Sequence, residues 1–266
     1  MSFLRSLLSS KAKSQKKAVR GPEHKPTPER PHFVIGDLHG CTNLLEKMLE
    51  EIDKIIGFIS LENPQIVFVG DYVDRGLDSR GVLTRLRGLI DEFPEHVTCL
   101  LGNHERMMLD FLDAPAARHT RWLRNGGAQT CASFGLAVDE HRMGDIVPEQ
   151  LAADLRRSMG PATEEWLRGL PLRIQSGNVF VVHAAVDPAR PIDDQSDRVL
   201  MWGHPEFMLR PRTDGIWVAH GHTIVDMPVA ENTRISVDTG AYRTGILSAA
   251  ALFPSGDHQF IRVKAG

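Results

Sequence analysis

The stretch GDYVDRG at residues 70–76 is the most informative part of the sequence. It directly follows the apolar run IVFV at residues 66–69. This run is short, rich in β-branched residues and bounded by a proline and a glycine, which is typical of a buried parallel strand. The two carboxylates that follow it therefore lie at the edge of a sheet where ligands commonly bind. Asp71 and Asp74 cannot both be neutralised by Arg75 alone, so the stretch indicates a bound metal ion.

The composition is that of an ordinary globular protein with one large domain. Its 266 residues are 42% hydrophobic and 24% charged. The three cysteines, Cys41, Cys99 and Cys131, form no CxxC pair, so we expect neither a disulfide framework nor a zinc ribbon. No apolar run approaches the roughly 20 residues that span a bilayer. We therefore expect a monomer in the reducing cytoplasm.

The N-terminal segment differs in charge from the rest of the chain. Residues 1–32 hold eight Lys or Arg and two acidic residues, whereas the remainder holds 23 basic and 32 acidic residues. An apolar helical face at residues 3–8 precedes a lysine cluster, and four prolines follow. We expect residues 1–31 to be a disordered basic tail with a proline-rich linker, and a domain from His32 to residue 266. A weak amphipathic anchor for an anionic membrane or a partner and an organellar transit peptide remain alternatives.

Strand and helix patterns alternate from His32 onward, which predicts a parallel sheet with helices on its faces. The predicted strands cover residues 32–36, 65–69, 97–101, 179–183, 216–219, 234–237, 245–252 and 259–263. The predicted helices cover residues 43–56, 79–93 and 105–112. Asn43 and Glu46 suggest a capping box at the first helix. Residues from 113 to about 170 break the alternation with three helical stretches, at 118–124, 148–159 and 161–170, which predicts an inserted helical cap.

Polar side chains follow five of the predicted strands. They are Asp37 and His39, then Asp71, then Asn103 and His104, then His183, and finally His220 and His222. Asp37 and His39 are two residues apart in extended backbone, so they project to the same side and can share one ion. Each group alone has an ordinary explanation as a turn residue or a satisfied polar side chain. Together they supply enough oxygen and nitrogen donors for two ions, and this donor set suits Mn²⁺, Fe or Zn²⁺.

Five motifs in order carry a resemblance to a known family. They are GDLHG at 36–40, GDYVDRG at 70–76, GNHE at 102–105, His183 after its apolar strand, and HGHT at 220–223. This set resembles the phosphoprotein phosphatase family of calcineurin-like metallophosphoesterases, chiefly the bacterial and phage serine/threonine phosphatase branch and its relatives that hydrolyse diadenosine tetraphosphate. The resemblance implies an α/β fold in which a β-sandwich is flanked by helices, with a helical cap inserted at about 113–170.

The resemblance also implies a role for each matching residue. Asp37, His39 and His222 would hold one divalent ion, Asn103 and His183 the other, and Asp71 both. Mn²⁺ is the expected metal, with Fe or Zn²⁺ as alternatives, and a hydroxide bridging the ions would attack phosphorus in line. Arg75, Asn103 and His104 would contact the phosphate. His104 would also protonate the leaving oxygen, with Asp74 as its partner.

Several neighbouring residues receive weaker assignments. We expect Asp238 to support a histidine, His220 to pack behind the site, and Cys41 to be a buried filler. Tyr242 and Arg243 either line the cleft or are ordinary loop residues. A second phosphate-binding arginine is expected shortly after Trp202, but Gly203 and His204 stand there, which leaves Arg210 or Arg212 as substitutes.

Three functions follow from these assignments. The first is hydrolysis of phosphomonoesters, chiefly phosphoserine and phosphothreonine in proteins, and the second is hydrolysis of dinucleoside polyphosphates. The third is an inactive phosphate-binding scaffold, which the complete set of ligands, Arg75 and His104 disfavours. The expected partners are a phosphorylated protein or a nucleotide substrate, with weak membrane or partner contact through the basic tail. The tail lacks the interleaved aromatic residues and motifs of nucleic-acid-binding proteins, so no nucleic acid is expected.

Overall fold

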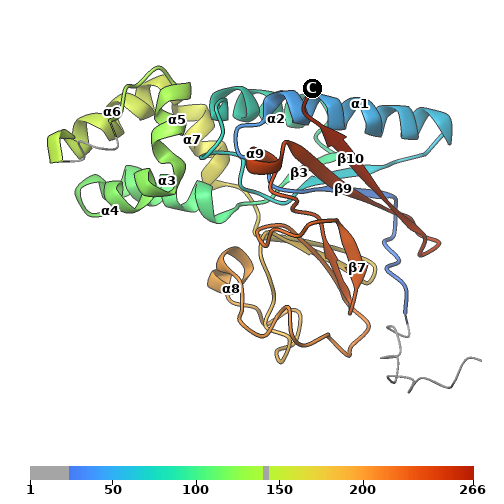
Figure 1. Cartoon of the computed structure of the whole chain (residues 1–266). Helices are drawn as coiled ribbons and strands as arrows, with labels where there is room; N and C mark the ends of the chain where they lie inside the picture. The colour runs from blue at the N-terminus through green and yellow to red at the C-terminus, as the bar shows by residue number, and fades with distance from the viewer. Residues whose placement is uncertain (1–23, 140–143) are drawn as a thin grey trace, which may run out of the picture.

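The computed structural model describes residues 24–139 and 144–266. Two five-stranded sheets stack into a sandwich, with helices on the outer face of the first sheet and further helices to one side (Figure 1). The expected α/β fold, a β-sandwich flanked by helices, is confirmed. The apolar stretch at residues 3–8 and the lysine cluster of the expected tail lie outside the described residues.

The first sheet has the strand order β10-β9-β1-β2-β3. Its strands are β1 (His32–Ile35), β2 (Gln65–Phe68), β3 (Val97–Cys99), β9 (Ile246–Leu252) and β10 (His258–Lys264). The first three run parallel, and β9 runs antiparallel to β1 and β10. The parallel sheet expected from the strands that alternate with helices is confirmed for β1, β2 and β3, and the last two strands add an antiparallel hairpin along the edge of β1.

The second sheet has the order β4-β5-β6-β8-β7. Its strands are β4 (Arg173–Ser176), β5 (Val179–Val182), β6 (Trp217–His220), β7 (Val229–Glu231) and β8 (Arg234–Ser236). The three central strands, β5, β6 and β8, run parallel, and β4 and β7 close the two edges in antiparallel fashion. The sequence patterns miss both edge strands, which are short and only partly buried.

The central strands are buried on both faces, which explains their continuous apolar runs. On β1, Phe33 and Ile35 pack into the core beneath the helices, whereas Val34 lies in the core between the two sheets. Strand β5 alternates in the same way, with Val181 facing the first sheet and Val182 facing the outer layer. Because successive side chains point to opposite faces of the sheet, each of these strands contributes side chains to two cores.

Helices α1 (Thr42–Phe58) and α2 (Ser79–Glu92) cover the outer face of the first sheet (Figure 1). The capping box predicted at Asn43 and Glu46 is wrong, because α1 begins one residue earlier and has no side-chain cap. Glu46 instead accepts a hydrogen bond from Arg85 Nε of α2 at 2.8 Å. Asp78 caps α2 by accepting from the Gly81 amide at 2.8 Å. The two helices are therefore joined through their side chains rather than capped separately.

The expected helical insertion is present between the two sheets in the chain. Helix α3 (Asn103–Asp113) leads into α4 (Pro115–Trp122), the π-helix η1 (Leu123–Gly127), α5 (Ala128–Ser133), α6 (Pro148–Met159) and α7 (Pro161–Arg168). Trp122, Leu155 and Leu167 are buried in the same core as the helices over the first sheet. The insertion is therefore part of the domain core, and two short helices, α8 (Asp197–Trp202) and α9 (Ala241–Thr244), complete the fold.

Residues 24–31 are fixed to the sandwich, so the ordered domain begins before the expected His32. The carbonyl of His24 accepts from Trp217 Nε1 at 2.7 Å. The side chain of Asn178 accepts from the Thr27 amide at 2.6 Å and donates to the Lys25 carbonyl at 2.9 Å. Within the ranges that the structure covers, no helix combines the length and apolar character that a membrane span requires.

We expect Asn178→Ala to release this N-terminal segment without unfolding the sandwich. The change removes hydrogen bonds to Thr27 and Lys25, each with a net contribution of about 0.5–1.5 kcal/mol. Exchange of the Thr27 amide should accelerate about tenfold in a hydrogen-exchange measurement. Gln175→Ala, at an exposed position of the adjoining strand, is the matched control. Equal protection of Thr27 in both variants would contradict the assignment.

Candidate metal centre and active site

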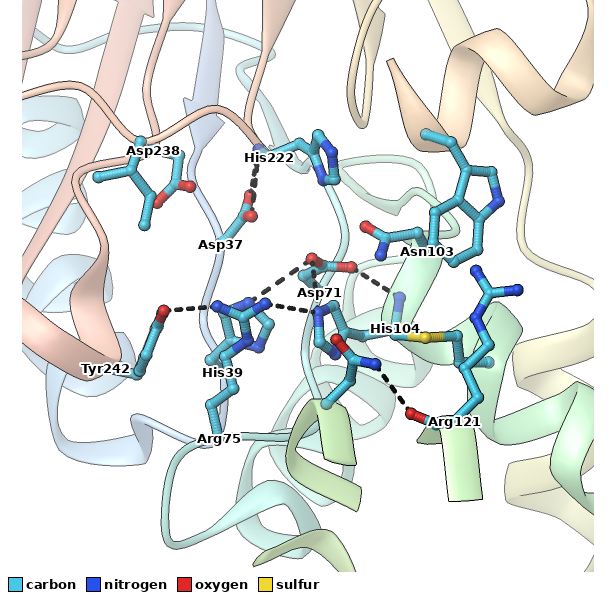
Figure 2. A pocket seen from close by; sticks show the side chains of 14 residues that line it. Asp37, His39, Asp71, Arg75, Asn103, His104, Arg121, His222, Asp238 and Tyr242 are labelled. Atoms are coloured by element: carbon cyan, nitrogen blue, oxygen red, sulfur yellow. Dashed lines mark hydrogen bonds and ion pairs between the residues drawn. The ribbon is translucent and has the colours of Figure 1, made fainter. Parts of the chain in front are cut away.

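The loops that follow the parallel strands of both sheets converge on one pocket of about 260 Å³ (Figure 2). Of the residues predicted to form the site, the following line the pocket: Asp37, His39, Asp71, Arg75, Asn103, His104 and His222. His183 lies behind the pocket wall and is fully buried. Asp74 is also fully buried and reaches the site through its contact with His104. The structure therefore brings all of these predicted residues into one cluster.

The first two loops are joined through their backbones. The amide of His39 donates to the Asp71 carbonyl at 2.8 Å, and Gly40 donates to Tyr72 at 2.9 Å. Gly76 packs against the same loop so closely that a Cβ there would lie 1.8 Å from the His39 carbonyl oxygen. Only glycine fits this close approach, which keeps the Asp37 and Asp71 side chains in fixed relative positions.

Several residues in the loops around the pocket have left-handed backbone conformations. The φ angles are 41° at His39, 52° at Asp71, 72° at Asp74, 67° at Arg75 and 61° at His222. Such conformations are uncommon for residues other than glycine and cost of order 1–3 kcal/mol each. The surrounding hydrogen bonds must therefore outweigh this strain to aim these side chains into the pocket.

Asp71 lies at the centre of the histidines. Its carboxylate oxygens lie 3.6 Å from His39 Nε2, 3.4 Å from His183 Nε2 and 3.9 Å from His104 Nε2. Asp71 belongs to two groups whose donor atoms lie within 4.8 Å of one another, one with His39 and His104 and one with His183 and His222. A single carboxylate is therefore shared by two clusters of potential ligands.

The structure corrects the predicted grouping of His222. This residue was expected beside Asp37 and His39, but its ring lies 5.1 Å from the ring of His183, centre to centre. Only its backbone amide faces Asp37, to which it donates at 3.1 Å. The imidazole therefore belongs with His183, and Asn103 Oδ1 joins them at 2.8 Å from His183 Nε2.

The protonation states of these groups suit divalent cations. Burial lowers the pKa of His39 to about 3 and that of His183 to about 4, so both imidazoles are neutral at pH 7, as metal ligation requires. Burial, Asp238 and Asp71 raise the pKa of Asp37 well above its usual range. A cation between carboxylates that repel one another in this way would stabilise their charged forms. The oxygen and nitrogen donors therefore fit Mn²⁺, Fe or Zn²⁺.

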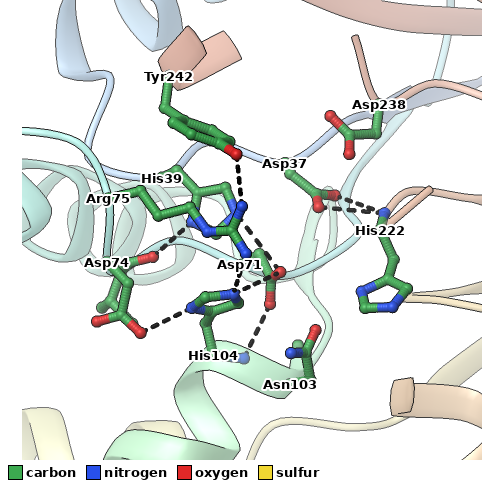
Figure 3. A network of polar contacts seen from close by, with 12 residues as sticks. Asp37, His39, Asp71, Asp74, Arg75, Asn103, His104, His222, Asp238 and Tyr242 are labelled. Atoms are coloured by element: carbon green, nitrogen blue, oxygen red, sulfur yellow. Dashed lines mark hydrogen bonds and ion pairs between the residues drawn. The ribbon is translucent and has the colours of Figure 1, made fainter. Parts of the chain in front are cut away.

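His104 and Asp74 form a buried pair beside this centre (Figure 3). His104 Nδ1 lies 2.7 Å from Asp74 Oδ2. Burial acts to lower the pKa of His104, but the carboxylates of Asp71 and Asp74 outweigh it and raise this pKa. The insertion supports Asp74 from the other side, because Thr130 Oγ1 donates to it at 2.7 Å and Trp122 Nε1 at 3.1 Å.

Glu105 is the main structural residue to which the sequence assigned no role. Its fully buried carboxylate accepts the backbone N–H groups of Gly102 at 3.0 Å, Asp71 at 2.9 Å, Tyr72 at 2.7 Å and Val73 at 3.1 Å. The residue is the last of the GNHE motif, which was the available signal. Its burial beneath a neighbouring loop could not be read from spacing.

The arginines around the pocket differ from expectation. Arg210 pairs with Glu206 at 2.6 Å, and Arg212 is buried against Asp214, so neither substitute lines the pocket. The pocket is lined instead by Arg121, a residue that the sequence did not single out.

Tyr242 lines the pocket and accepts a hydrogen bond from Arg75, whereas Arg243 is exposed and lies outside the lining. Arg75 Nη2 also lies 3.3 Å from His104 Nε2.

The remaining weaker assignments are resolved as follows. His220 is buried behind the site, with Nε2 2.9 Å from Ser236 Oγ, as expected. Asp238 accepts from the Gly240 amide at 2.7 Å and neighbours Asp37 rather than a histidine, so its predicted role is wrong. Cys41 lies outside the pocket lining and packs against the core.

The chain is similar to several known proteins. A family model described as calcineurin-like phosphoesterase matches residues 31–231. Serine/threonine-protein phosphatase 1 of Salmonella typhimurium is 39% identical over 95 residues, which are 36% of this chain and 38% of that protein. The asymmetrical bis(5'-nucleosyl)-tetraphosphatase PrpE of Oceanobacillus iheyensis is 26% identical over 87% of this chain and 91% of its own. The crystal structure of a putative diadenosine tetraphosphatase aligns with a TM-score of 0.58 at 22% identity, over 91% of this chain and 97% of the other.

We expect Glu105→Gln to destabilise the protein and weaken metal binding together. The amide NH₂ of glutamine would have to face N–H donors that the carboxylate now accepts, at a cost of about 1–3 kcal/mol. Thermal unfolding and metal content would be measured on the same preparation. Glu46→Gln, which alters a partly exposed pair with Arg85, should change stability by only about 0–1 kcal/mol. A Glu105→Gln protein with unchanged melting temperature would refute the role.

Proposed function

The chain belongs to the calcineurin-like phosphoesterase family, and from this premise we propose that it hydrolyses phosphate esters or anhydrides with two divalent ions in the pocket around Asp71. The observation that carries the proposal is the position of Asp71 in both ligand groups. A carboxylate shared in this way is what a two-ion centre requires. Asp37 and His39 would hold one ion, and the ligands of the other would be Asn103, His183 and His222.

The ions, when bound, supply positive charge to the phosphoryl oxygens and lower the pKa of water. Mn²⁺ is the proposed metal, with Fe or Zn²⁺ as alternatives that the same donors accept. The protein holds the donors in place through the left-handed loops and keeps His39 and His183 neutral. These imidazoles therefore do not have to lose a proton before they bind metal.

The other pocket residues bind the phosphoryl group and supply a proton. Arg75 presents its guanidinium fork to phosphate oxygens, while the Tyr242 hydroxyl fixes its orientation. His104 directs Nε2 into the pocket and carries the proton for the leaving oxygen. Asp74 stabilises the charged imidazole through Nδ1 at 2.7 Å. The two acids of the GDYVDRG stretch therefore serve different purposes, one for the metals and one for the proton donor.

Two substrate classes are candidates. Phosphoserine and phosphothreonine in proteins are supported by the likeness to the Salmonella protein phosphatase, although the matched stretch spans 38% of that protein. Dinucleoside polyphosphates are supported by the PrpE relative, which aligns over 91% of its length. The proposed partner is accordingly a phosphorylated protein or a nucleotide. We propose the cytoplasm as its location, supported by three free thiols at Cys41, Cys99 and Cys131.

We expect metal-dependent hydrolysis of p-nitrophenyl phosphate that EDTA abolishes and Mn²⁺ restores. Asp71→Asn should lose both ions together, because this carboxylate belongs to both groups, and turnover should fall by about 10³-fold. Metal content would be measured by mass spectrometry beside activity. Asp91→Asn, an exposed change on α2, is the control. Retention of one full metal equivalent by Asp71→Asn would exclude a shared ligand.

The pH profile should reveal the proton donor. The raised pKa of His104 keeps its imidazolium present to higher pH, and activity that requires it declines as pH rises through this pKa. Asp74→Asn removes one of the carboxylates that raise this pKa, so the descending limb of kcat should move to lower pH. His104→Asn should remove that limb and slow poor leaving groups most. If the descending limb of kcat lies at the same pH in Asp74→Asn as in the wild type, the group that titrates is not His104.

A further inference from the structure

A second guanidinium faces the pocket from the side of the helical insertion (Figure 2). Arg121 lies in the last turn of α4, and its guanidinium carbon lies 4.7 Å from the centre of the Trp202 ring. Both residues line the same pocket as Arg75. The pair joins the insertion to α8, a helix that follows the second sheet's β5 in the chain.

The segment that carries Arg121 contacts the loop of Asp74 and Arg75 at two points that follow Arg121 in the chain. Trp122 donates to Asp74 at 3.1 Å, and the Arg75 amide donates to the Gly126 carbonyl at 3.3 Å. Gly126 has a φ of 107°, and a Cβ there would lie 2.3 Å from the Arg75 nitrogen. The segments that carry Arg121 and Arg75 therefore contact each other directly, which restricts the spacing between the two residues.

The charge of Arg121 is held by stacking and not by a carboxylate. Among residues 24–139 and 144–266, no ion pair involves Arg121, whereas Arg168 on the same insertion pairs with Asp113 and Glu164. A cation–π contact orients the guanidinium with about 0.5–2 kcal/mol but leaves its N–H donors free. A guanidinium group that is oriented in this way, without a carboxylate partner and beside a pocket suited to phosphate, can bind the oxygens of a further phosphate.

We infer that Arg121, seated on Trp202, binds a second phosphate linked to the one that is cleaved. The inference rests on the proposed function and selects its second substrate class, the nucleoside and dinucleoside polyphosphates. A phosphoserine side chain offers a single phosphate, on which Arg75 and Arg121 would both have to converge from different segments. A phosphoanhydride satisfies both guanidinium groups.

The chemistry of such a cleavage gives Arg121 a defined task. A water oxygen forms a bond to phosphorus, the bridging P–O bond breaks, and the leaving phosphate keeps the electron pair. His104 gives a proton to that leaving oxygen, and the proton lost by the water is released to solvent. Arg121 then neutralises the negative charge on the phosphate oxygens of the leaving group, and the alcohol released from a phosphoserine has no such phosphate.

The test compares diadenosine tetraphosphate with p-nitrophenyl phosphate under Mn²⁺. Arg121→Ala should lower the ratio of the two kcat/KM values about 10- to 100-fold, the loss expected for a charged hydrogen bond, and Arg121→Lys should restore part of it. Arg124→Ala, an exposed arginine of the same insertion outside the pocket lining, should leave both values unchanged. An Arg121→Ala enzyme with an unchanged ratio overturns the inference.

A binding measurement separates this inference from the proposed function. Methylenediphosphonate and orthophosphate would be compared as inhibitors of p-nitrophenyl phosphate hydrolysis. The wild type should prefer the bisphosphonate, and Arg121→Ala should lose about tenfold of that preference. Equal loss of affinity for both inhibitors would place Arg121 on the cleaved phosphate instead. A wild type that hydrolyses neither substrate with Mn²⁺ would refute the proposed function itself.

Discussion

Four backbone N–H groups converge on the buried carboxylate of Glu105, and the rest of the site depends on this contact. The loop after β2 runs through the interior, where unpaired amides would be costly. It also holds Asp71 and Asp74 in left-handed conformations that a free loop would leave. One side chain at the start of α3 supplies acceptors for this loop and for the loop after β3. The ligands on the two loops are thereby held in register with one another.

The helical insertion provides the second layer of support. Trp122 and Thr130 donate hydrogen bonds to Asp74, which in turn contacts His104, so the proposed proton donor is oriented by a segment that carries none of the recognisable motifs. The same segment brings Arg121 to the pocket and rests its Gly126 on Arg75. The same segment therefore supports the proposed proton donor and carries the proposed substrate contact, so a change in the insertion should alter both.

The motif residues were predictable because they follow apolar strands at fixed offsets, and the central strands of both sheets were found for the same reason. Strands β4 and β7 were missed because they are short edge strands without a long apolar run. The partner of His222 could not be deduced, since spacing in the sequence does not reveal that its backbone is left-handed, with a φ of 61°. Glu105 and Arg121 act through burial and through contacts between segments distant in sequence. Such contacts leave no periodic signal in the chain.

Residues 24–31 are attached at one end of the sandwich, and the pocket lies at the other end. Asn178, which holds Thr27 and Lys25, precedes the first residue of β5, and Arg30 bonds to the carbonyl of Glu95, just ahead of β3. The pocket lies at the carboxyl ends of these parallel strands. Residues 24–31 therefore lie against the end of the sandwich opposite to the pocket residues. A label attached at His24 would therefore sit at the end of the sandwich away from the pocket residues, where it would leave them uncovered.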